Sequence, residues 1–585
     1  MLNHKDVSIE INGVLLPSFV QLMLKQSINT HHYFDITLDI QAVESYSAGT
    51  LDVSKDWVGK KVRLHLGERT FVGIATSVGL HRSDGTHGNI RISGMSSTFL
   101  LESAPTCSSW RDKSLSYIVK ELSDKCGVQS VINPETKSKI EYECQYGETN
   151  FGFIQRLARQ YSEWLYYDGL SLVFGKPDFG PSIPLTYGRD LYELDVCSQI
   201  VARPLQGSSY SSSSDQTYSG KSPDSVSGLG QLGKCAFDAS MALFPTPAVQ
   251  HAEPRISSKG DLDAHFQRKQ QGDAASSHFI TGESSCMDLT VGSIIDVSSE
   301  SHTGIGSYTE QSVGSYIVTE IVHVAGMGGS YRNSFTALPS SVPTLPSPDV
   351  PLPVAQTQQA TVVNNDDPKH LGRVQVRMGW QTGGMQTSWI RVLTPDAGVS
   401  DKVSSNRGFV FIPEKGDQVM VAFRYDDPNR PFVLGSLFHG KSGTGGGDSN
   451  KTKSLTTRSG CTVTLDDEKG SVTIADPTGS TVILNGDKTI TIDAKDKITI
   501  HSKEIEIHAD EKIRIEADSK VEVLGKTSTF EGTSEAKIKS KTSIKEEAAT
   551  IDIKASTTLK ATGTTVDIDG SAMTNVKGGL LNLNP

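Results

Sequence analysis

The sequence has little of what disulfide-rich secreted proteins and membrane proteins need. Its 585 residues include seven cysteines, an odd number, and no two of them form a Cys-x-x-C pair. Scattered thiols of this kind favour reduced cysteines in a cytoplasm. No apolar run approaches the ~18 residues of a membrane helix, and the N-terminus shows no signal-peptide core. We therefore expect a cytoplasmic protein that, if it leaves the cell, does so outside the general secretory route.

Aromatic residues and positive charge are also scarce. Aromatic residues make up 7% of the chain and hydrophobic residues 36%, which is low for a compact enzyme and suits a chain with a large, thin β part. The formal net charge of −11 argues against nucleic acid or an anionic membrane surface as a standing partner. By length alone, we expect about four domains.

What the sequence does contain is a repeat near its C-terminus. Between about residues 489 and 525, pairs of β-branched residues flank one polar residue, with a step of eight residues and one step of seven. Each pair places two side chains on one face of a strand, and the charged remainder of each unit predicts a corner. The pairs are Ile490 and Ile492, Ile498 and Ile500, Ile505 and Ile507, Ile513 and Ile515, and Val521 and Val523.

These octads predict a β-helical prism around an aliphatic axis. A strand that buries two side chains and leaves both backbone edges open needs a partner above and below it. At ~4.8 Å per octad, roughly a dozen octads would make a rod of about 60 Å. The triangular section closes either by one chain going round in three octads or by three identical chains. A single chain would show side-chain sizes with a period of 24, and none is apparent, so three chains are favoured and the five pairs form the predicted trimer axis.

The N-terminal region, residues 1–338, predicts two barrel-like β subdomains with helices. Apolar and polar positions alternate in short runs, which is typical of antiparallel strands. One amphipathic helix is expected between a cap at Asp112 or Ser114 and a stop at Gly127. A second is expected over 150–163 and runs into a hairpin with an Asp-Gly turn at residues 168 and 169. The serine-rich segment 207–228 predicts a mobile loop.

Two linkers are expected around a compact β unit. A proline-rich segment, 339–355, and a glycine-rich segment, 440–450, mark its boundaries. Residues 356–439 contain five or six short strands with glycine and proline between them, which suits a small barrel of the OB type. Residues 451–585 form the predicted spike.

Three segments resemble one known family. GRVQVRMGW, WIRVLTPDAG, IPEKGDQVMVAF and DDPNRPFVLGSLF, all within residues 372–438, resemble the OB domain of contractile injection spikes: the VgrG proteins of type VI secretion and the central spikes of contractile phage tails. Residues 146–175 look like the helix and hairpin of the family's phage-hub-like domain, and the octads look like its triple-stranded β-helix. The resemblance covers nearly the whole chain in the same order. One departure is Asp426, where the family usually has the glycine of Gly-Asp-Pro.

The resemblance implies a mainly β, intertwined homotrimer with a phage-hub-like region, an OB-fold barrel and a C-terminal triple-stranded β-helix. Such a spike sits on the end of a hexameric, Hcp-like secretion tube and meets the target membrane only transiently. Its cytoplasmic pool would be secreted by the machine on firing. After Lys577 the chain loses all charge, and three copies of its apolar end would form a platform that seeks a partner. In this family the partner is a PAAR-repeat tip protein or effector, so the predicted tip-binding residues are Leu580, Leu581, Asn582 and Leu583.

Two glycine motifs imitate nucleotide sites. Residues 435–442 match G-x-x-x-x-G-K-S, but the glycine run that follows cannot begin the helix whose amides hold a phosphate. Residues 228–233 match G-x-G-x-x-G, but they follow serine-rich sequence and no strand, so they predict flexible glycine linkage. We expect no cofactor at either place.

No catalytic or metal-ligating group is expected. His501 and His508 stand one octad step apart, and an imidazole row is conceivable, but exposed edge positions are the simpler interpretation. The last residues contain no His or Cys, so no metal tip is expected. Two alternatives stay open: the spike of a phage tail or extracellular injection particle, and, more remotely, a single-chain β-helix that acts on carbohydrate and would be a monomer.

Overall fold

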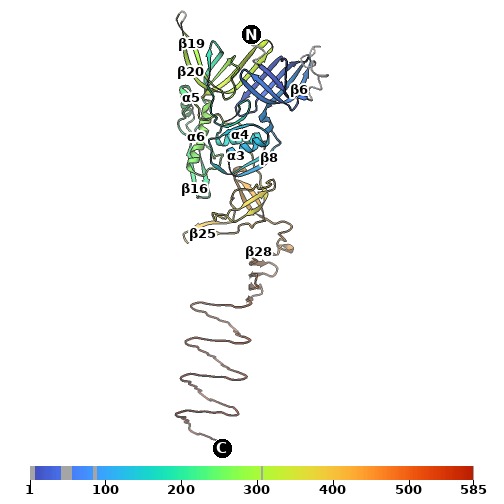
Figure 1. Ribbon diagram of the computed structural model, residues 1–585. Helices are drawn as coiled ribbons and strands as arrows, with labels where there is room; N and C mark the ends of the chain where they lie inside the picture. Colours follow the sequence, from blue (N-terminus) through green and yellow to red (C-terminus); the bar gives the residue numbers. More distant parts are fainter. Residues whose placement is uncertain (1–6, 41–55, 83–87, 305–306, 584–585) are drawn as a thin grey trace. The chain divides into compact units, whose positions relative to one another are not determined.

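The computed structural model describes residues 7–40, 56–82, 88–304 and 307–583 (Figure 1). The chain divides into two compact units, residues 1–447 and 448–585. Strands predominate in the first unit, as the alternating sequence patterns predicted. The second unit has strands up to residue 493, whereas the octads after it do not form the expected strands within one chain. None of the helices in the described ranges is both long and apolar enough to span a bilayer.

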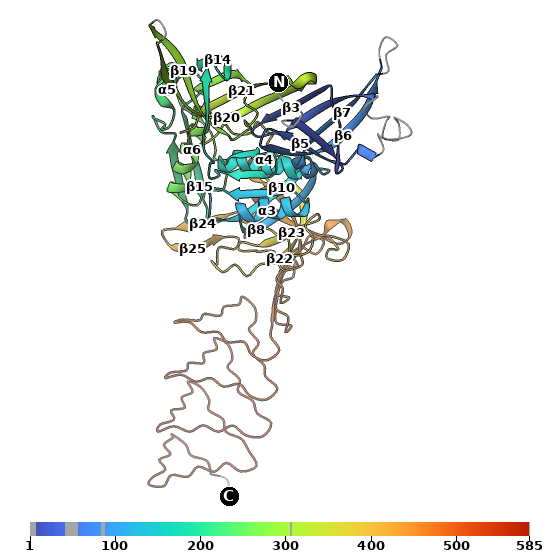
Figure 2. The same ribbon diagram turned by 45° about the horizontal axis from the view of Figure 1, so that its top comes forward.

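The N-terminal part of the first unit contains two barrel-like halves that share one 13-stranded sheet (Figure 2). One half closes on itself because its first and last strands, β19 and β20, pair with each other. The other half is joined to it through the antiparallel pair β20 and β3. The closed half contains β13 (Ile183–Tyr187), β14 (Leu191–Ser198), β18 (His278–Ser284), β19 (Ile294–Gly304), β20 (Ser307–Gly326) and β21 (Tyr331–Pro339). The other half contains β1 (Val7–Ile11), β2 (Val14–Leu15), β3 (Gln21–Ser27), β4 (Tyr33–Asp39), β5 (Lys61–Leu66), β6 (Arg69–His81) and β7 (Asn89–Ser96).

Each half has its own apolar core, and alternation along the strands builds it. In β5, Val62, Leu64 and Leu66 are buried while Lys61 and Arg63 face solvent. The same period of two runs through β7 and β18. The expected alternation is therefore present in the described strands, although β13 pairs in parallel with β14 and β19.

A smaller layer of helices and short strands lies below the two halves. Ser114 caps the first helix by accepting a hydrogen bond from the Tyr117 amide, and Thr149 caps the second in the same way at Gly152. The hairpin turn at Asp168 and Gly169 is also present, with Gly169 at φ +106°. The layer contains η1 (Ser97–Leu101), β8 (Thr106–Ser114), α3 (Leu115–Lys125), β9 (Ser130–Asn133), β10 (Lys139–Glu148), α4 (Asn150–Tyr161), β11 (Leu165–Tyr167) and β12 (Leu172–Gly175).

The serine-rich segment 207–228 is not the mobile loop that its composition predicted. It contributes to an antiparallel hairpin of β15 (Leu205–Ser211) and β16 (Gln216–Lys221), which packs against α6 (Lys259–Ala275). β17 (Ala248–Val249) joins its edge. The hairpin folds because Leu205 and Tyr218 pack on the α6 residues Leu262 and Phe266. Local composition does not reveal this distant partner.

The glycine motif at 228–233 also differs from expectation, since it begins a helix. α5 (Gly230–Leu243) starts within it, and Gly228 and Gly230 take φ values of +81° and +67°. These left-handed conformations favour glycine. The motif is therefore the entry turn of a helix and no flexible linker.

The proline-rich segment 339–355 is a packed strap along the hub, although composition suggested a free linker. Val342, Leu345 and Ala355 are at most 4% exposed. The strap is also held by side chains of the hub: Asn29 Nδ2 donates to the carbonyl of Pro346 at 2.8 Å. We use the name proline strap for residues 339–355 below.

The next part of the first unit is a small β barrel with a projecting hairpin. A four-stranded sheet, β23-β22-β26-β27, surrounds a core that includes Val362, Val376, Val419 and Val433. Its strands are β22 (Gln358–Asn364), β23 (Gln375–Met378), β26 (Gln418–Phe423) and β27 (Pro431–Leu437), and the hairpin is β24 (Ala397–Ser400) with β25 (Val403–Gly408). The lookalike phosphate motif at 435–442 begins inside β27, and no α-helix follows it up to residue 583.

Asp426 stands where the resemblance implied glycine, and the backbone shows why glycine would suit the place. η3 (Arg424–Asp426) carries left-handed φ values at Tyr425 and Asp426, 60° and 55°. Aspartate tolerates this region better than most residues with a side chain. The turn is therefore left-handed at two successive residues with aspartate in the second place.

The second unit begins with an antiparallel meander and continues as an extended chain. The meander contains β28 (Thr452–Thr456), β29 (Thr462–Asp466), β30 (Ser471–Ala475), β31 (Thr481–Leu484) and β32 (Ile490–Asp493). From residue 494 to 583 the described chain contains no helix or strand and runs in wide turns (Figure 1). Ile490 and Ile492, the first predicted axis pair, lie in β32, so the meander and the octad repeat overlap at this pair.

Candidate assembly surfaces

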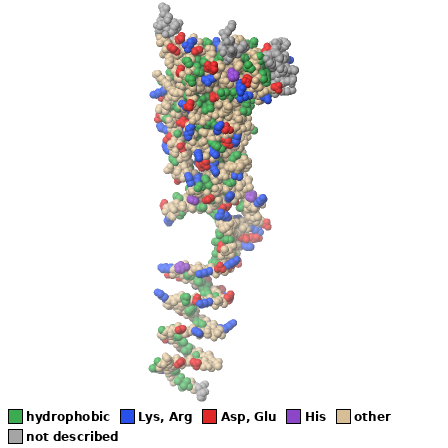
Figure 3. Space-filling model, viewed as in Figure 1, with side chains coloured by type: hydrophobic (Ala, Val, Ile, Leu, Met, Phe, Trp, Pro, Cys, Tyr) green, Lys and Arg blue, Asp and Glu red, His purple; other side chains and the backbone are tan. Residues whose placement is uncertain are grey.

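The ten predicted axis residues form a row of exposed aliphatic side chains in the single chain. We call them the aliphatic ladder: Ile490, Ile492, Ile498, Ile500, Ile505, Ile507, Ile513, Ile515, Val521 and Val523. Each is at least 52% exposed, and the most exposed, Ile515, reaches 74%. Figure 3 shows hydrophobic side chains recurring along the turns of this unit. A soluble protein seldom leaves so long a row uncovered, which marks it as a contact surface.

The turns that carry the ladder have a second, charged face. Arg514 stands between two ladder isoleucines and forms an ion pair with Glu516. Lys520 and Glu522 form the corresponding pair around Val521. Side chains at alternate positions of an extended segment point to opposite sides. The ion pairs therefore suit solvent on one side, while the ladder needs a cover on the other.

The backbone of these turns also lacks partners. Between residues 494 and 583, in the part of the chain that the structure describes, no ladder of strand hydrogen bonds is formed. Extended backbone without a neighbour presents open edges that readily pair with another chain. From Ile498 onward, both the side chains and the backbone of the ladder residues thus lack neighbours within one chain and could accept further strands.

The hairpin of the OB barrel carries a second apolar surface, which sequence reasoning did not single out. We call residues 393–411 the OB arm. Leu393, Val399, Phe409, Val410 and Phe411 are 51% to 66% exposed, and the arm projects from the barrel in Figure 1. The signal in the sequence is the run Phe-Val-Phe at 409–411. Successive side chains of a strand point to opposite faces of the sheet, so three consecutive apolar residues cannot all point into the core of the barrel.

The predicted tip residues lie exposed as well. Leu580 and Leu583 are each 81% exposed and Leu581 is 56% exposed, with Asn582 between them. No charged residue occurs from 578 onward. The geometry shows an uncovered apolar segment, and its partner stays a prediction.

His501 and His508, for which exposed edge positions were the simpler interpretation, are not part of a metal-ligand group among the described residues. His501 and His508 are exposed, and His508 lies 3.7 Å from the carboxylate of Asp510 with both side chains more than nine-tenths exposed. No set of three or more His, Cys, Asp or Glu side chains suited to a metal ion occurs in the described ranges.

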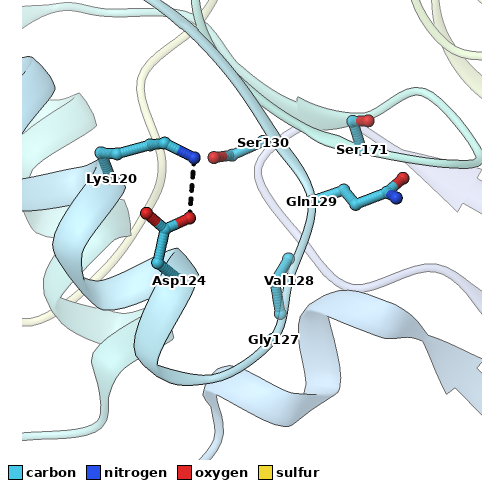
Figure 4. Close-up of a pocket in the computed structure, with 7 residues that line it drawn as sticks. All are labelled: Lys120, Asp124, Gly127, Val128, Gln129, Ser130 and Ser171. Atoms are coloured by element: carbon cyan, nitrogen blue, oxygen red, sulfur yellow. Dashed lines mark hydrogen bonds and ion pairs between the residues drawn. The ribbon is translucent and has the colours of Figure 1, made fainter.

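One hollow of about 500 Å³ lies beside the end of α3 (Figure 4). Its only carboxylate, Asp124, is already bound to Lys120 at 2.7 Å. The other lining residues are Gly127, Val128, Gln129, Ser130 and Ser171. The two titratable groups that line this hollow, Lys120 and Asp124, are thus paired with each other.

Two parts of the chain match described families. Residues 358–438 match the type VI secretion system/phage-baseplate injector OB domain. Residues 29–175 match the phage tail baseplate hub. Residues 358–438 contain the strands of the OB barrel, and residues 29–175 contain strands β4 to β7 and the helical layer. The two stretches occur in the order that the resemblance implied.

Comparison with characterised proteins gives spike proteins as relatives. The type VI secretion system spike protein VgrG1b of Pseudomonas aeruginosa is 22% identical over 418 residues, which are 65% of this chain and 53% of that protein. The actin cross-linking toxin VgrG1 of Vibrio cholerae is 32% identical over 124 residues, 19% of this chain and 11% of that protein. The similar stretches thus span about half of the first relative and a small part of the second.

A solved structure shares the fold. A chain of the half-lidded PdpA–VgrG complex of Francisella superposes with a TM-score of 0.51 at 10% identity, over 83% of this chain and 87% of that chain. The two family matches and this solved structure therefore agree with the architecture described above. The chain is therefore similar to VgrG spike proteins, and it contains a phage baseplate hub domain and an injector OB domain at the matched residues.

Proposed function

We propose that three copies of this chain form the spike of a contractile injection machine of the type VI kind. The aliphatic ladder carries the proposal, because its ten side chains repeat at the step of one prism face and are uncovered in the single chain. Burying an aliphatic side chain of this size contributes about 1.5–3 kcal/mol. Three chains winding round a shared axis would gain this at every rung and pair their open backbone edges.

Such a prism suits the transmission of axial force. Its strands would be joined laterally by backbone hydrogen bonds and along the axis by Ile and Val contacts. Buckling the rod would require breaking stacked bonds on all three faces together. A rod this thin also has too little interior for a catalytic core, so we propose a mechanical function and no enzymatic one. The toxin name of the Vibrio cholerae relative refers to a protein of which the similar stretch is 11%.

The hub supports an attachment to a sixfold tube. Each chain contributes two barrel-like halves, so three chains would present six similar barrels in a ring. A ring of six is the arrangement that would mate with a hexameric, Hcp-like tube protein. On this proposal the protein assembles in the cytoplasm and leaves the cell with the machine, and meets the target membrane only during passage.

The oligomeric mass tests the proposal directly. One chain has a mass of 63.0 kDa, and we expect light scattering of the full chain to give three times this value. A single-chain β-helix enzyme would give the mass of one chain. A purified, folded protein that stays monomeric at micromolar concentration would overturn the spike proposal. The names of the relatives support type VI secretion over a phage tail.

The tip gives a second prediction. Deleting residues 578–585 should abolish binding of a PAAR-repeat tip protein, because it removes the exposed Leu580, Leu581 and Leu583. The trimer should persist, since the aliphatic ladder lies upstream of the deletion. A pull-down with the tip protein measures the loss, and Lys577→Ala serves as a control beside the deleted segment. Undiminished capture by the shortened chain would refute this assignment.

A further inference from the structure

Three segments that are far apart in sequence meet where the OB barrel joins the hub. The turn before β27 supplies Asn429, whose side chain is only 2% exposed. Its Nδ2 donates to Glu143 Oε1 at 2.6 Å, and its Oδ1 accepts from the Cys144 amide at 2.8 Å. One amide side chain of the OB barrel therefore makes two buried hydrogen bonds to β10 of the hub.

The partner of Asn429 is itself held firmly. Glu143 accepts from Arg156 Nη1 at 3.1 Å and from the Tyr161 hydroxyl at 3.0 Å, and both donors lie on α4. Arg156 also binds Glu148 at 2.7 Å and the Cys144 carbonyl at 2.6 Å. Glu143 and Arg156 are at most 2% exposed, so the socket that receives Asn429 is polar and buried.

The next residue of the same turn, Arg430, contacts the third segment, residues 252–254. Arg430 is anchored by Asp427 at 2.8 Å, and its Nη2 donates to the carbonyls of Ala252 and Pro254. This segment precedes α6 in the hub module. A guanidinium presents its donors in a rigid fork, so one arginine can hold several carbonyls at once.

Helix α4 completes the connection through Arg159. Its Nη2 binds Glu253 at 3.1 Å, and its Nη1 donates to the carbonyl of Val350 in the proline strap at 2.7 Å. The same helix thus fixes the strap, the segment before α6 and, through Glu143, the OB turn. A separate contact supports the joint, since Gln381 of the OB barrel donates to Ser109 Oγ of β8 at 2.8 Å.

We propose that these side chains form a hub–OB lock that makes the OB barrel and the hub one rigid body, with α4 at its centre. The hub–OB lock is defined as Glu143, Arg156, Arg159, Asn429 and Arg430. Without it, the proline strap would be the covalent connection on which the barrel could swing. The lock would carry axial load from the hub into the spike through buried, charge-assisted hydrogen bonds. Only the statement about load rests on the proposed function.

The test measures the rigidity of the joint in the full-length protein. Spin labels on non-natural residues at the exposed positions Asp124 in α3 and Lys415 in the OB barrel report the distance between the two parts. We expect a narrow distance distribution in the unaltered protein. The double variant N429A/R430A should broaden it at least about twofold and speed hydrogen exchange at the Cys144 amide about tenfold, because a buried donor loses its partner.

The matched control variants remove one asparagine and one arginine side chain elsewhere in the OB domain. Asn365 binds Glu414 at 3.0 Å within the barrel, and Arg407 binds Asp396 at 2.8 Å on the OB arm. N365A and R407A should leave the distribution narrow. If N429A/R430A does not fold, R430K provides a milder variant, since lysine keeps the charge and loses the fork; it should broaden the distribution less.

The possible outcomes distinguish a failure of the hub–OB lock proposal from a failure of the trimeric spike proposal. A folded lock variant with the same narrow distribution as the unaltered protein would overturn the lock, whatever its oligomeric mass. A monomeric protein with a narrow distribution that broadens in N429A/R430A would support the lock and overturn the spike. Equal broadening in the control variants would also overturn the lock, because the effect would then not belong to this joint.

Discussion

Replacing Ile500 and Ile507 together with aspartate should convert the assembled protein into single chains. In a threefold prism each substitution occurs three times at the same height, so the variant would place two clusters of three carboxylates on the axis. Each chain would lose the burial of two isoleucines, about 2 kcal/mol apiece, and like charges in an apolar interior add a larger cost. We expect light scattering to show a mass near that of one chain.

The polar residue inside the same pair gives the control. Thr499 lies between Ile498 and Ile500 and is placed on the outer face by the alternation of an extended segment. Thr499→Asp adds the same charge in the same octad and should leave the mass three times that of one chain. In the next octad, Glu506 already occupies the corresponding position. If I500D/I507D remained trimeric, or if T499D dissociated equally, the axis would not run along the ladder.

The fold of the first unit could largely be predicted where the deciding interactions are local. Alternation identified β5, and the cap at Ser114 and the turn at Gly169 needed only neighbouring residues. The prediction of a mobile loop at 207–228 was wrong for the opposite reason, because the hairpin in this segment depends on packing against the distant helix α6. The prediction of a linker at the proline strap was wrong for a similar reason. Its composition predicts a stiff segment but does not reveal the surface against which the segment packs.

The candidate surfaces divide in the same way. A repeat is visible in the sequence itself, so the aliphatic ladder could be found and its exposure checked. The hub–OB lock could not be found, because Asn429 and Glu143 are 286 residues apart and neither stands in a periodic pattern. Polar residues that meet only in the folded chain leave no local signal. The OB arm lies between these cases, because its apolar run was visible but its direction was not.

A second large effect is expected in the hub, which should lose stability steeply as the pH falls below about 6.5. Burial lowers the pKa of both His32 and His323 to about 3. Both side chains are at most 1% exposed. Gln26 lies between them, with its Nε2 3.2 Å from His32 Nδ1 and its Oε1 3.1 Å from His323 Nε2. Because an amide nitrogen donates and an amide oxygen accepts, His32 Nδ1 must be unprotonated and His323 Nε2 must carry a proton. The bridge therefore requires a neutral His32, while burial is what disfavours the charged form of His323.

The sign of the effect follows from the direction of the shift. An unfolded chain protonates its histidines near pH 6.5, whereas the folded hub keeps His32 and His323 neutral down to about pH 3. Between these values the unfolded state binds more protons, so acid favours unfolding. Each histidine's cost approaches about 1.4 kcal/mol per pH unit once the unfolded chain is fully protonated, so the two together should lower the free energy of unfolding by roughly 3 kcal/mol between pH 6.5 and pH 5.

Replacing both histidines with glutamine should flatten this dependence. The double variant H32Q/H323Q keeps hydrogen-bonding side chains next to Gln26 and removes both buried proton acceptors. It should start from a lower stability at pH 7, because the packing is altered, and then lose less than the unaltered protein on acidification. Thermal unfolding midpoints of the full chain at pH 7, 6 and 5 measure the difference in slope. His508→Gln removes an exposed imidazole from the second unit and is the matched control. An equally steep slope in H32Q/H323Q would mean that the acid sensitivity of the hub arises at other groups, such as His265, whose pKa burial lowers to about 4.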